Sequence, residues 1–187
     1  LTFTGGEATL RPDLVELVQY AEDVGMVTGL QTNGRRLRDR AFVDALLAAG
    51  LDHIQITLES HDPAIHDRMS GCPGAWEETV AGIKAVVAAD IYMMTNTTMT
   101  TENVDGIEET IAFIASLGVP TFGCNSLIYS GAGVAVGTGI RESELEPILE
   151  RVKEAAQEQN LRLIWYTPTQ YCEFNPISME LGIKGCT

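Results

Sequence analysis

The chain has 187 residues, enough for one domain with a substantial hydrophobic core. Its formal net charge of −14 argues against a nucleic-acid surface, because few cations remain to neutralise phosphates. No apolar run reaches the length of a membrane span, no signal peptide is visible, and four cysteines are too few for a disulfide scaffold. These features predict a cytoplasmic protein that binds neither nucleic acid nor membrane.

Short apolar, β-branched runs alternate with helical patterns along the chain. The predicted strands, in order, are residues 1–4, 27–31, 53–58, 91–99, 120–127 and 161–165. Between them, apolar residues recur at helical spacing. Asp39 is placed to cap one helix, Gly50 to end it, and Ser143 with Glu146 to form a capping box for the last helix. Roughly every thirty residues the pattern repeats, which predicts an α/β fold with a parallel sheet and right-handed crossovers.

Polar and glycine-rich segments follow the strands at their carboxyl ends, where open and closed parallel sheets both place their ligand sites. These segments are Gly5-Gly6-Glu7, Thr32-Asn33-Gly34, residues 57–60, the region of Asn96 and residues 129–133. The turns at the opposite edge are shorter and plainer. This one-sidedness predicts a functional site at the carboxyl edge of the sheet.

The segment Gly5-Gly6-Glu7 has two possible interpretations. Two residues without Cβ let the backbone turn sharply and expose its polar groups to a ligand, and the following carboxylate can bind an ammonium group. A strand-to-helix turn with a solvated Glu would have the same sequence.

Conventional catalytic motifs are missing. His53 begins a strand and suits a structural role, while His61 and His66 lack the His-Glu-x-x-His spacing of a zinc site. Neither a nucleophilic serine elbow nor a phosphate-binding loop occurs in the sequence. The remaining hydroxyls, amides and carboxylates suit a polar cofactor that supplies its own chemistry.

Four ordered segments resemble the radical S-adenosylmethionine superfamily. Residues 3–10 are similar to its Gly-Gly-Glu-Pro segment, with Ala8 in place of the proline, and Thr32-Asn33-Gly34 to its Thr-Asn-Gly turn. Residues 56–60, followed by His66-Asp67-Arg68 and Gly74, resemble its Val-Ser-Leu-Asp-Ser strand end and His-Asp stretch. Asn96 and then residues 101–103 resemble its next core strand and helix start.

The resemblance implies a partial (β/α)6 TIM-like barrel over residues 1–166, with its first strand upstream of Leu1. It implies that Gly5, Gly6 and Glu7 hold the amino group of S-adenosylmethionine. Thr57, Glu59 and Ser60 would then lie near its carboxylate or ribose, and Asn96 and the loop from Tyr129 near its ribose and adenine. For Thr32, Asn33 and Asp67, a ligand role and a turn-building role stay equally open.

The Cys-x-x-x-Cys-x-x-Cys loop that binds the 4Fe-4S cluster of this superfamily does not occur in the sequence. The chain begins without Met inside an apparent strand and ends after Gly185-Cys186-Thr187 in no recognisable element. We therefore expect a middle piece of a longer protein, with the cluster loop upstream and the piece inactive on its own.

Residues 167–187 lack core periodicity and resemble the start of a SPASM or twitch extension, which binds auxiliary iron–sulfur clusters. Cys172 and Cys186 would be its first two cluster ligands. The alternative is two unrelated thiols. Cys72 and Cys124 are expected to be ordinary residues.

The resemblance favours a radical S-adenosylmethionine enzyme of the group that includes molybdenum cofactor biosynthesis protein A and the pyrroloquinoline quinone maturase. It implies a peptide or a cofactor precursor as substrate and a flavodoxin- or ferredoxin-like electron donor. Two rivals stay open. One is an acid–base TIM-barrel lyase or isomerase that uses Glu7, Glu59 or Asp67. The other is a non-catalytic barrel that binds a nucleoside or a partner protein.

Overall fold

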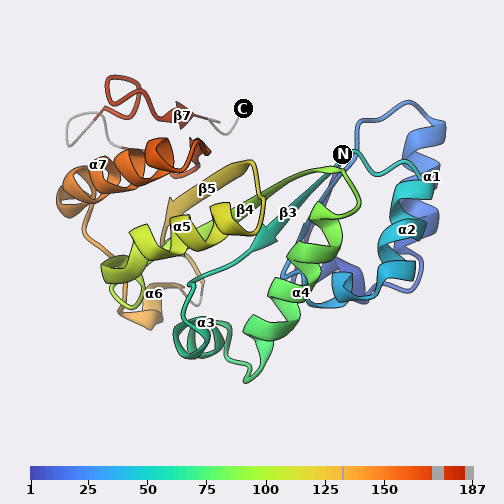
Figure 1. Cartoon of the computed structure of the whole chain (residues 1–187), viewed down its shortest axis with the longest axis horizontal. Helices are drawn as coiled ribbons and strands as arrows, with labels where there is room; N and C mark the ends of the chain where they lie inside the picture. Colours follow the sequence, from blue (N-terminus) through green and yellow to red (C-terminus); the bar gives the residue numbers. More distant parts are fainter. Residues whose placement is uncertain (132, 170–174, 184–187) are drawn as a thin grey trace.

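The computed structural model describes residues 1–131, 133–169 and 175–183, which form an α/β fold around one parallel sheet (Figure 1). Its seven strands, in sheet order, are β1 Thr2–Phe3, β2 Gly29–Thr32, β3 His53–Thr57, β4 Tyr92–Met99, β5 Thr121–Ser126, β6 Arg162–Trp165 and β7 Gly182–Ile183. In this part of the chain β1 and β7 each pair with one neighbour, so the sheet is open. The predicted fold, a partial barrel of parallel strands, is confirmed.

Helices connect successive strands from β1 to β6. They are α1 Leu14–Asp23, α2 Arg40–Ala48, α3 Pro63–Ser70, α4 Ala75–Val87, α5 Ile107–Ser116, α6 Gly133–Val136 and α7 Glu142–Glu158, with the 3₁₀ turns η1 Ala8–Leu10, η2 Arg35–Arg38 and η3 Val104–Gly106. Figure 1 shows α1 and α2 at one end of the molecule, α4 and α5 in front of the sheet, and α7 at the other end.

Two of the predicted helix caps can be checked directly. Asp39 caps α2, because its carboxylate accepts hydrogen bonds from the backbone N–H groups of Ala41 and Phe42. The predicted capping box of Ser143 with Glu146 is wrong. Helix α7 begins at Glu142, and the Glu144 carboxylate accepts from the Arg141 N–H at 3.3 Å, so Ser143 already lies within the first turn.

The hydrophobic core lies between the sheet and the helices. Ile54 and Ile56 of β3 and Leu58, which follows it, are fully buried members of this core. Because successive side chains alternate between the two faces of a strand, Gln55 and Thr57 face away from the helices. The sheet thus has one apolar, helix-covered face and one open face.

The open face is polar and carries little charge. Alternation and register place on it the amide and hydroxyl side chains of Gln31, Gln55, Thr57, Asn96, Thr98 and Asn125. Strands β2, β3, β4 and β5 contain neither Lys nor Arg. This face therefore suits hydrogen bonding to an uncharged polar ligand.

Strand β7 was not expected from the sequence, where periodicity ends at Thr167. It pairs in parallel with β6, through Ile164 with Gly182 and Trp165 with Ile183. Part of the predicted extension 167–187 therefore continues the sheet, and the boundary at residue 166 stays a prediction. No helix in the described part of the chain is long and apolar enough to cross a membrane.

Candidate functional site

A cavity of about 320 Å³ lies at the carboxyl ends of β1, β2 and β3, the edge that the sequence predicts. It combines residues from the first three strand ends with others from α3 and the start of α4. Its lining is Thr4, Gly5, Gly6, Glu7, Gln31, Thr32, Asn33, Arg35, Gln55, Thr57, Glu59, His66, Ser70, Cys72, Ala75 and Thr79. Seven predicted site residues thus meet in one cavity: Gly5, Gly6, Glu7, Thr32, Asn33, Thr57 and Glu59.

Glu7 is held in place by four hydrogen bonds. Its Oε1 accepts from the Thr9 N–H at 3.0 Å and from the Thr9 and Thr32 hydroxyls at 2.6 Å each. In the described part of the chain, its Oε2 accepts only from the Asn33 N–H, at 2.8 Å. A carboxylate oxygen accepts two or more hydrogen bonds, so Oε2 keeps capacity for a donor from the cavity.

Glu7 is ionised at neutral pH. Burial is the largest influence and opposes the charge, but hydrogen bonds from Thr32, Thr9 and Asn33 outweigh it and hold the pKa of Glu7 below its ordinary value. A fixed anion with a free lone pair, at the edge of a cavity, fits a ligand ammonium group.

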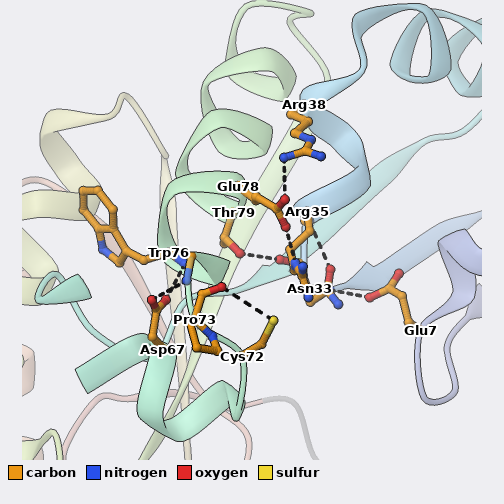
Figure 2. Close-up of polar contacts among 12 residues, drawn as sticks. Glu7, Asn33, Arg35, Arg38, Asp67, Cys72, Pro73, Trp76, Glu78 and Thr79 are labelled. Carbon is orange, nitrogen blue, oxygen red and sulfur yellow. Dashed lines mark hydrogen bonds and ion pairs between the residues drawn. The ribbon is translucent and has the colours of Figure 1, made fainter. Parts of the chain in front are cut away.

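The turn after β2 positions Asn33 and connects the cavity to α4 (Figure 2). The Asn33 N–H bonds to Glu7, its carbonyl accepts from the Thr79 hydroxyl at 2.8 Å, and its side-chain oxygen accepts from the Arg35 N–H at 3.0 Å. Arg35 in turn pairs with Glu78 at 2.5 Å. Both Thr32 and Asn33 therefore build this turn while they line the cavity.

Two glycines allow α4 to approach this turn. Gly34 has φ 77°, a conformation that side chains rarely adopt. A Cβ on Gly82 of α4 would lie 2.0 Å from the Gly34 carbonyl oxygen, so only glycine fits there. The close contact explains how α4 can support the cavity wall.

Glu59 extends from the end of β3 and is half-buried in the cavity wall. Its Oε2 accepts a hydrogen bond from the Thr98 N–H at 2.8 Å. Burial, only partly offset by this bond, raises the pKa of Glu59 to about 7. The group therefore exchanges its proton near neutral pH.

His66 lies on α3 and is a cavity residue to which sequence reasoning assigned no ligand role. Its Nδ1 accepts a hydrogen bond from the Glu59 N–H at 3.1 Å, and its side chain is buried. Burial lowers the pKa of His66, with an opposing effect from Asp67, so the ring is neutral. The resemblance of the His-Asp stretch drew attention to this helix, but it did not predict that the His66 ring faces the cavity.

Four predicted site residues lie outside the cavity lining. Asp67 accepts from the Gly74 and Trp76 N–H groups at 2.6 and 2.8 Å, and so has the contacts of a turn-building residue. The Ser60 hydroxyl accepts from the Asp62 N–H before α3.

The other two residues belong to the second half of the sheet. The Asn96 amide donates to the Asn125 side chain at 2.7 Å. Tyr129 is exposed, and its hydroxyl donates to the Ile140 carbonyl at 3.4 Å. Their predicted places at the ribose and adenine stay predictions.

The cysteines divide into three groups. Cys124 is fully buried in the core, whereas Cys72 lines the cavity beside Arg35, a position that its surrounding sequence does not reveal. Cys172 and Cys186, the predicted cluster ligands, lie outside the described residues. Among the residues that the structure describes, no three or more His, Cys, Asp or Glu side chains gather as a metal site.

Comparison with known proteins assigns a family to this arrangement. The model of the Radical SAM superfamily matches residues 1–114. The AdoMet-dependent heme synthase of Methanosarcina barkeri is 31% identical over 163 residues, which cover 87% of this chain and 46% of that protein. The PqqA peptide cyclase of Gluconobacter oxydans is 32% identical over 173 residues, 91% of this chain and 48% of that protein.

A solved structure shows the same fold. The crystal structure of Streptococcus suis SuiB bound to precursor peptide SuiA has a TM-score of 0.75 at 17% identity, covering 88% of this chain and 37% of SuiB. This chain therefore spans about half or less of the length of the relatives it matches.

Proposed function

Because the chain belongs to the radical S-adenosylmethionine superfamily, we propose that the cavity at the ends of β1, β2 and β3 binds S-adenosylmethionine. The observation that carries this proposal is the ionised Glu7, fixed by Thr9, Thr32 and Asn33 with one oxygen still able to accept. The space beside Gly5 and Gly6 is open, since a Cβ on either would have no atom within 4 Å. A ligand can therefore approach the backbone of both residues closely.

The remaining cavity residues fit the rest of this cofactor. Thr57 and Glu59 supply a hydroxyl and a carboxyl group toward its carboxylate or ribose, as the resemblance implies. When bound and reductively cleaved, S-adenosylmethionine supplies the 5′-deoxyadenosyl radical that abstracts hydrogen from a substrate. The chain's own residues bind and orient the cofactor and restrict water at the cavity wall.

The residues of this sequence do not fit the 4Fe-4S cluster itself. Cys72, Cys124, Cys172 and Cys186 lack the Cys-x-x-x-Cys-x-x-Cys spacing, so we derive no step through the cluster from this chain. The same proposal includes an auxiliary iron–sulfur cluster that is bound by Cys172 and Cys186.

A peptide is the substrate class that the relatives favour, since one is named a PqqA peptide cyclase and a structural neighbour is bound to a precursor peptide. A cofactor precursor is the second candidate, because another relative is a heme synthase. The polar, largely uncharged open face fits the amide groups of a peptide. A flavodoxin- or ferredoxin-like protein would supply the electron.

The proposal is tested by Glu7→Gln in the full natural polypeptide, prepared anaerobically. Loss of a charged hydrogen bond should weaken S-adenosylmethionine binding about 10- to 100-fold in calorimetry. Glu16→Gln, an exposed position on α1, is the matched control. Unchanged affinity with intact circular dichroism would remove Glu7 from the site.

Glu7→Gln also changes the turn, so a second variant separates fold from binding. Thr9→Val removes the hydroxyl bond to Glu7 but keeps its charge. We expect it to lower the melting temperature while retaining most of the cofactor affinity. A loss of affinity equal to that of Glu7→Gln would assign the effect to the turn rather than to the charge.

The rivals make different predictions for turnover. An acid–base lyase or isomerase would act without iron and form no 5′-deoxyadenosine, and a binding barrel would bind the nucleoside without consuming it. Release of 5′-deoxyadenosine from the reduced, cluster-loaded protein would exclude both. Its absence, with a cluster present and S-adenosylmethionine bound, would favour the binding barrel.

A further inference from the structure

Helices α1 and α2 leave a groove of about 520 Å³ between them, at one end of the molecule (Figure 1). Residues of both helices form its walls. The lining consists of Val15, Glu16, Gln19, Tyr20, Asp23, Ala45, Ala48 and Ala49. None of these residues lines the proposed cofactor cavity, so the groove is a second and separate concave surface.

The base of the groove is apolar. Ala49 is buried, and Val15 and Ala45 are half-buried beside it. Large apolar side chains extend from the rim, since Tyr20 is 68% exposed and Val24, one turn further along the chain, is 52% exposed. Small side chains at the base let another helix pack closely between the two. An apolar surface of this kind is typical of a site that binds protein.

The charged side chains that line the groove are both acidic. Glu16 and Asp23 are separated by two turns of α1, roughly 10 Å along its axis, and lie on the same face. In the described part of the chain neither forms an ion pair, although Asp23 accepts a hydrogen bond from the Gln19 amide at 3.0 Å. An apolar base beside two unpaired carboxylates is complementary to a basic amphipathic surface.

The same charges argue against other occupants. Nucleic acid and anionic lipid would bring phosphates toward Glu16 and Asp23, and like charges repel. A second copy of this chain offers no complementary helix, because none of the helices α1 to α7 carries a net positive charge. The occupant with matching charge is therefore a cationic helix of another protein.

We propose that the groove between α1 and α2 docks a basic amphipathic helix of a partner protein. Its apolar face would lie on Val15 and the alanines of α2, with Tyr20 packed against its side. Lys or Arg side chains separated by two helical turns would pair with Glu16 and Asp23. This inference goes beyond cofactor binding, because it assigns a second function to a surface outside the cavity.

The probe is a fluorescent synthetic peptide of about 18 residues, long enough to form a helix on its own. Leu and Ala form its apolar face, and Lys residues recur every two turns beside that face. A second peptide has Glu in place of each Lys. Fluorescence anisotropy with the full natural polypeptide should show that the Lys peptide binds at least about tenfold more tightly, and that its affinity falls as salt is added.

Two variants of the groove separate charge from shape. Reversal of both charges, by Glu16→Lys with Asp23→Lys, should weaken binding of the Lys peptide about tenfold. Ala48→Trp fills the groove at an exposed position without changing the charge, and should weaken binding by a similar factor. Neither variant should change the affinity for S-adenosylmethionine.

The matched control is Glu154→Lys with Glu158→Lys. These exposed residues line another acidic groove, between α5 and α7, and their reversal changes the net charge by the same amount. It should change the affinity for the Lys peptide by no more than about threefold.

Equal affinity for the Lys and Glu peptides, or a loss confined to the α7 variants, would overturn the proposal. Absence of binding would also overturn it, because the groove would then be covered in the natural polypeptide or too shallow for a helix. Circular dichroism shows whether each variant keeps its fold. Since the two sites share no residue, any of these results leaves the cofactor proposal intact, and failure of cofactor binding leaves this one intact.

Discussion

In the first half of the sheet, polar side chains at the strand ends face a cavity, whereas in the second half they bond to one another. Glu7, Asn33 and Glu59 line the cavity after β1, β2 and β3. After β4 and β5, the Asn96 amide nitrogen donates to Asn125, while the buried Asn96 side-chain oxygen has no hydrogen-bond partner in the described part of the chain. The comparison teaches that the sequence position of a polar residue predicts the edge of the sheet it reaches, but not whether its hydrogen bonds are already used.

We expect the largest effect from a substitution at Gly82, where α4 packs against the turn that lines the first half of the sheet. Gly82→Ala would place a Cβ 2.0 Å from the Gly34 backbone oxygen, and backbone cannot rotate away as a side chain can. We expect a loss of about 3 kcal/mol in unfolding free energy, together with weaker cofactor binding. Urea unfolding measures the first effect and calorimetry the second.

Ala81→Ser, at an exposed position of the same helix, is the control for Gly82→Ala. It should change stability by no more than about 0.5 kcal/mol. If Gly82→Ala were as mild as this control, the close contact between α4 and the Gly34 turn would not be needed for the cavity wall.

The second prediction concerns the proton on Glu59. Its folded pKa of about 7 lies above the ordinary 4.5, so the carboxyl group favours folding below pH 4.5, and this contribution is lost as the pH rises through 7. Glu59→Gln should therefore match the wild type near pH 4.5 and be more stable at pH 8, by about 2 kcal/mol and no more than about 3.

Urea unfolding of both proteins between pH 4.5 and 8 measures this difference. Besides Glu59, the ionisable residues that line the cavity are Glu7, Arg35, His66 and Cys72, and all four are unchanged in the variant. Parallel pH profiles for the wild type and Glu59→Gln would show that the carboxyl group is solvated like that of the exposed Glu16.

The smallest effect is expected in the second half. Tyr129→Phe removes one weak hydrogen bond, 3.4 Å long, to the Ile140 carbonyl, and Tyr129 does not line the cavity. Cofactor affinity should change less than about twofold. A tenfold loss in the same calorimetric assay would restore the predicted contact with ribose or adenine and weaken the contrast between the halves.

Much of the fold follows from local sequence patterns. The succession of strands β1 to β6 along the chain, their parallel direction and the cap by Asp39 were predicted, because alternation and capping depend on a few neighbouring residues. The Ser143 cap was wrong because the helix pattern extends to Glu142, one residue before it, and Glu144 serves the same purpose as Glu146. Strand β7 has two residues, too few for any period to show.

The site was less predictable, because it depends on long-range contacts. Glu7 could be placed from Gly5-Gly6-Glu7, but its partner Thr32 is 25 residues away. His66 and Glu59 are joined by a bond between a ring and a backbone N–H, which no residue pattern indicates. The sequence could not distinguish a ligand role from a turn-building role for Asp67. In the fold, its carboxylate accepts hydrogen bonds from two backbone N–H groups.

The lack of Lys and Arg in β2 to β5 has a consequence for ligand turnover. The cavity wall holds the ionised carboxylate of Glu7, and its one cationic lining residue in the described chain, Arg35, is paired with Glu78, so the Glu7 carboxylate is the charge left to face a ligand. A low-dielectric wall strengthens the field of this charge. The field would attract a sulfonium cation and would bind the products less tightly once that positive charge had disappeared. Neutral fragments would therefore leave the cavity more easily than the intact cation.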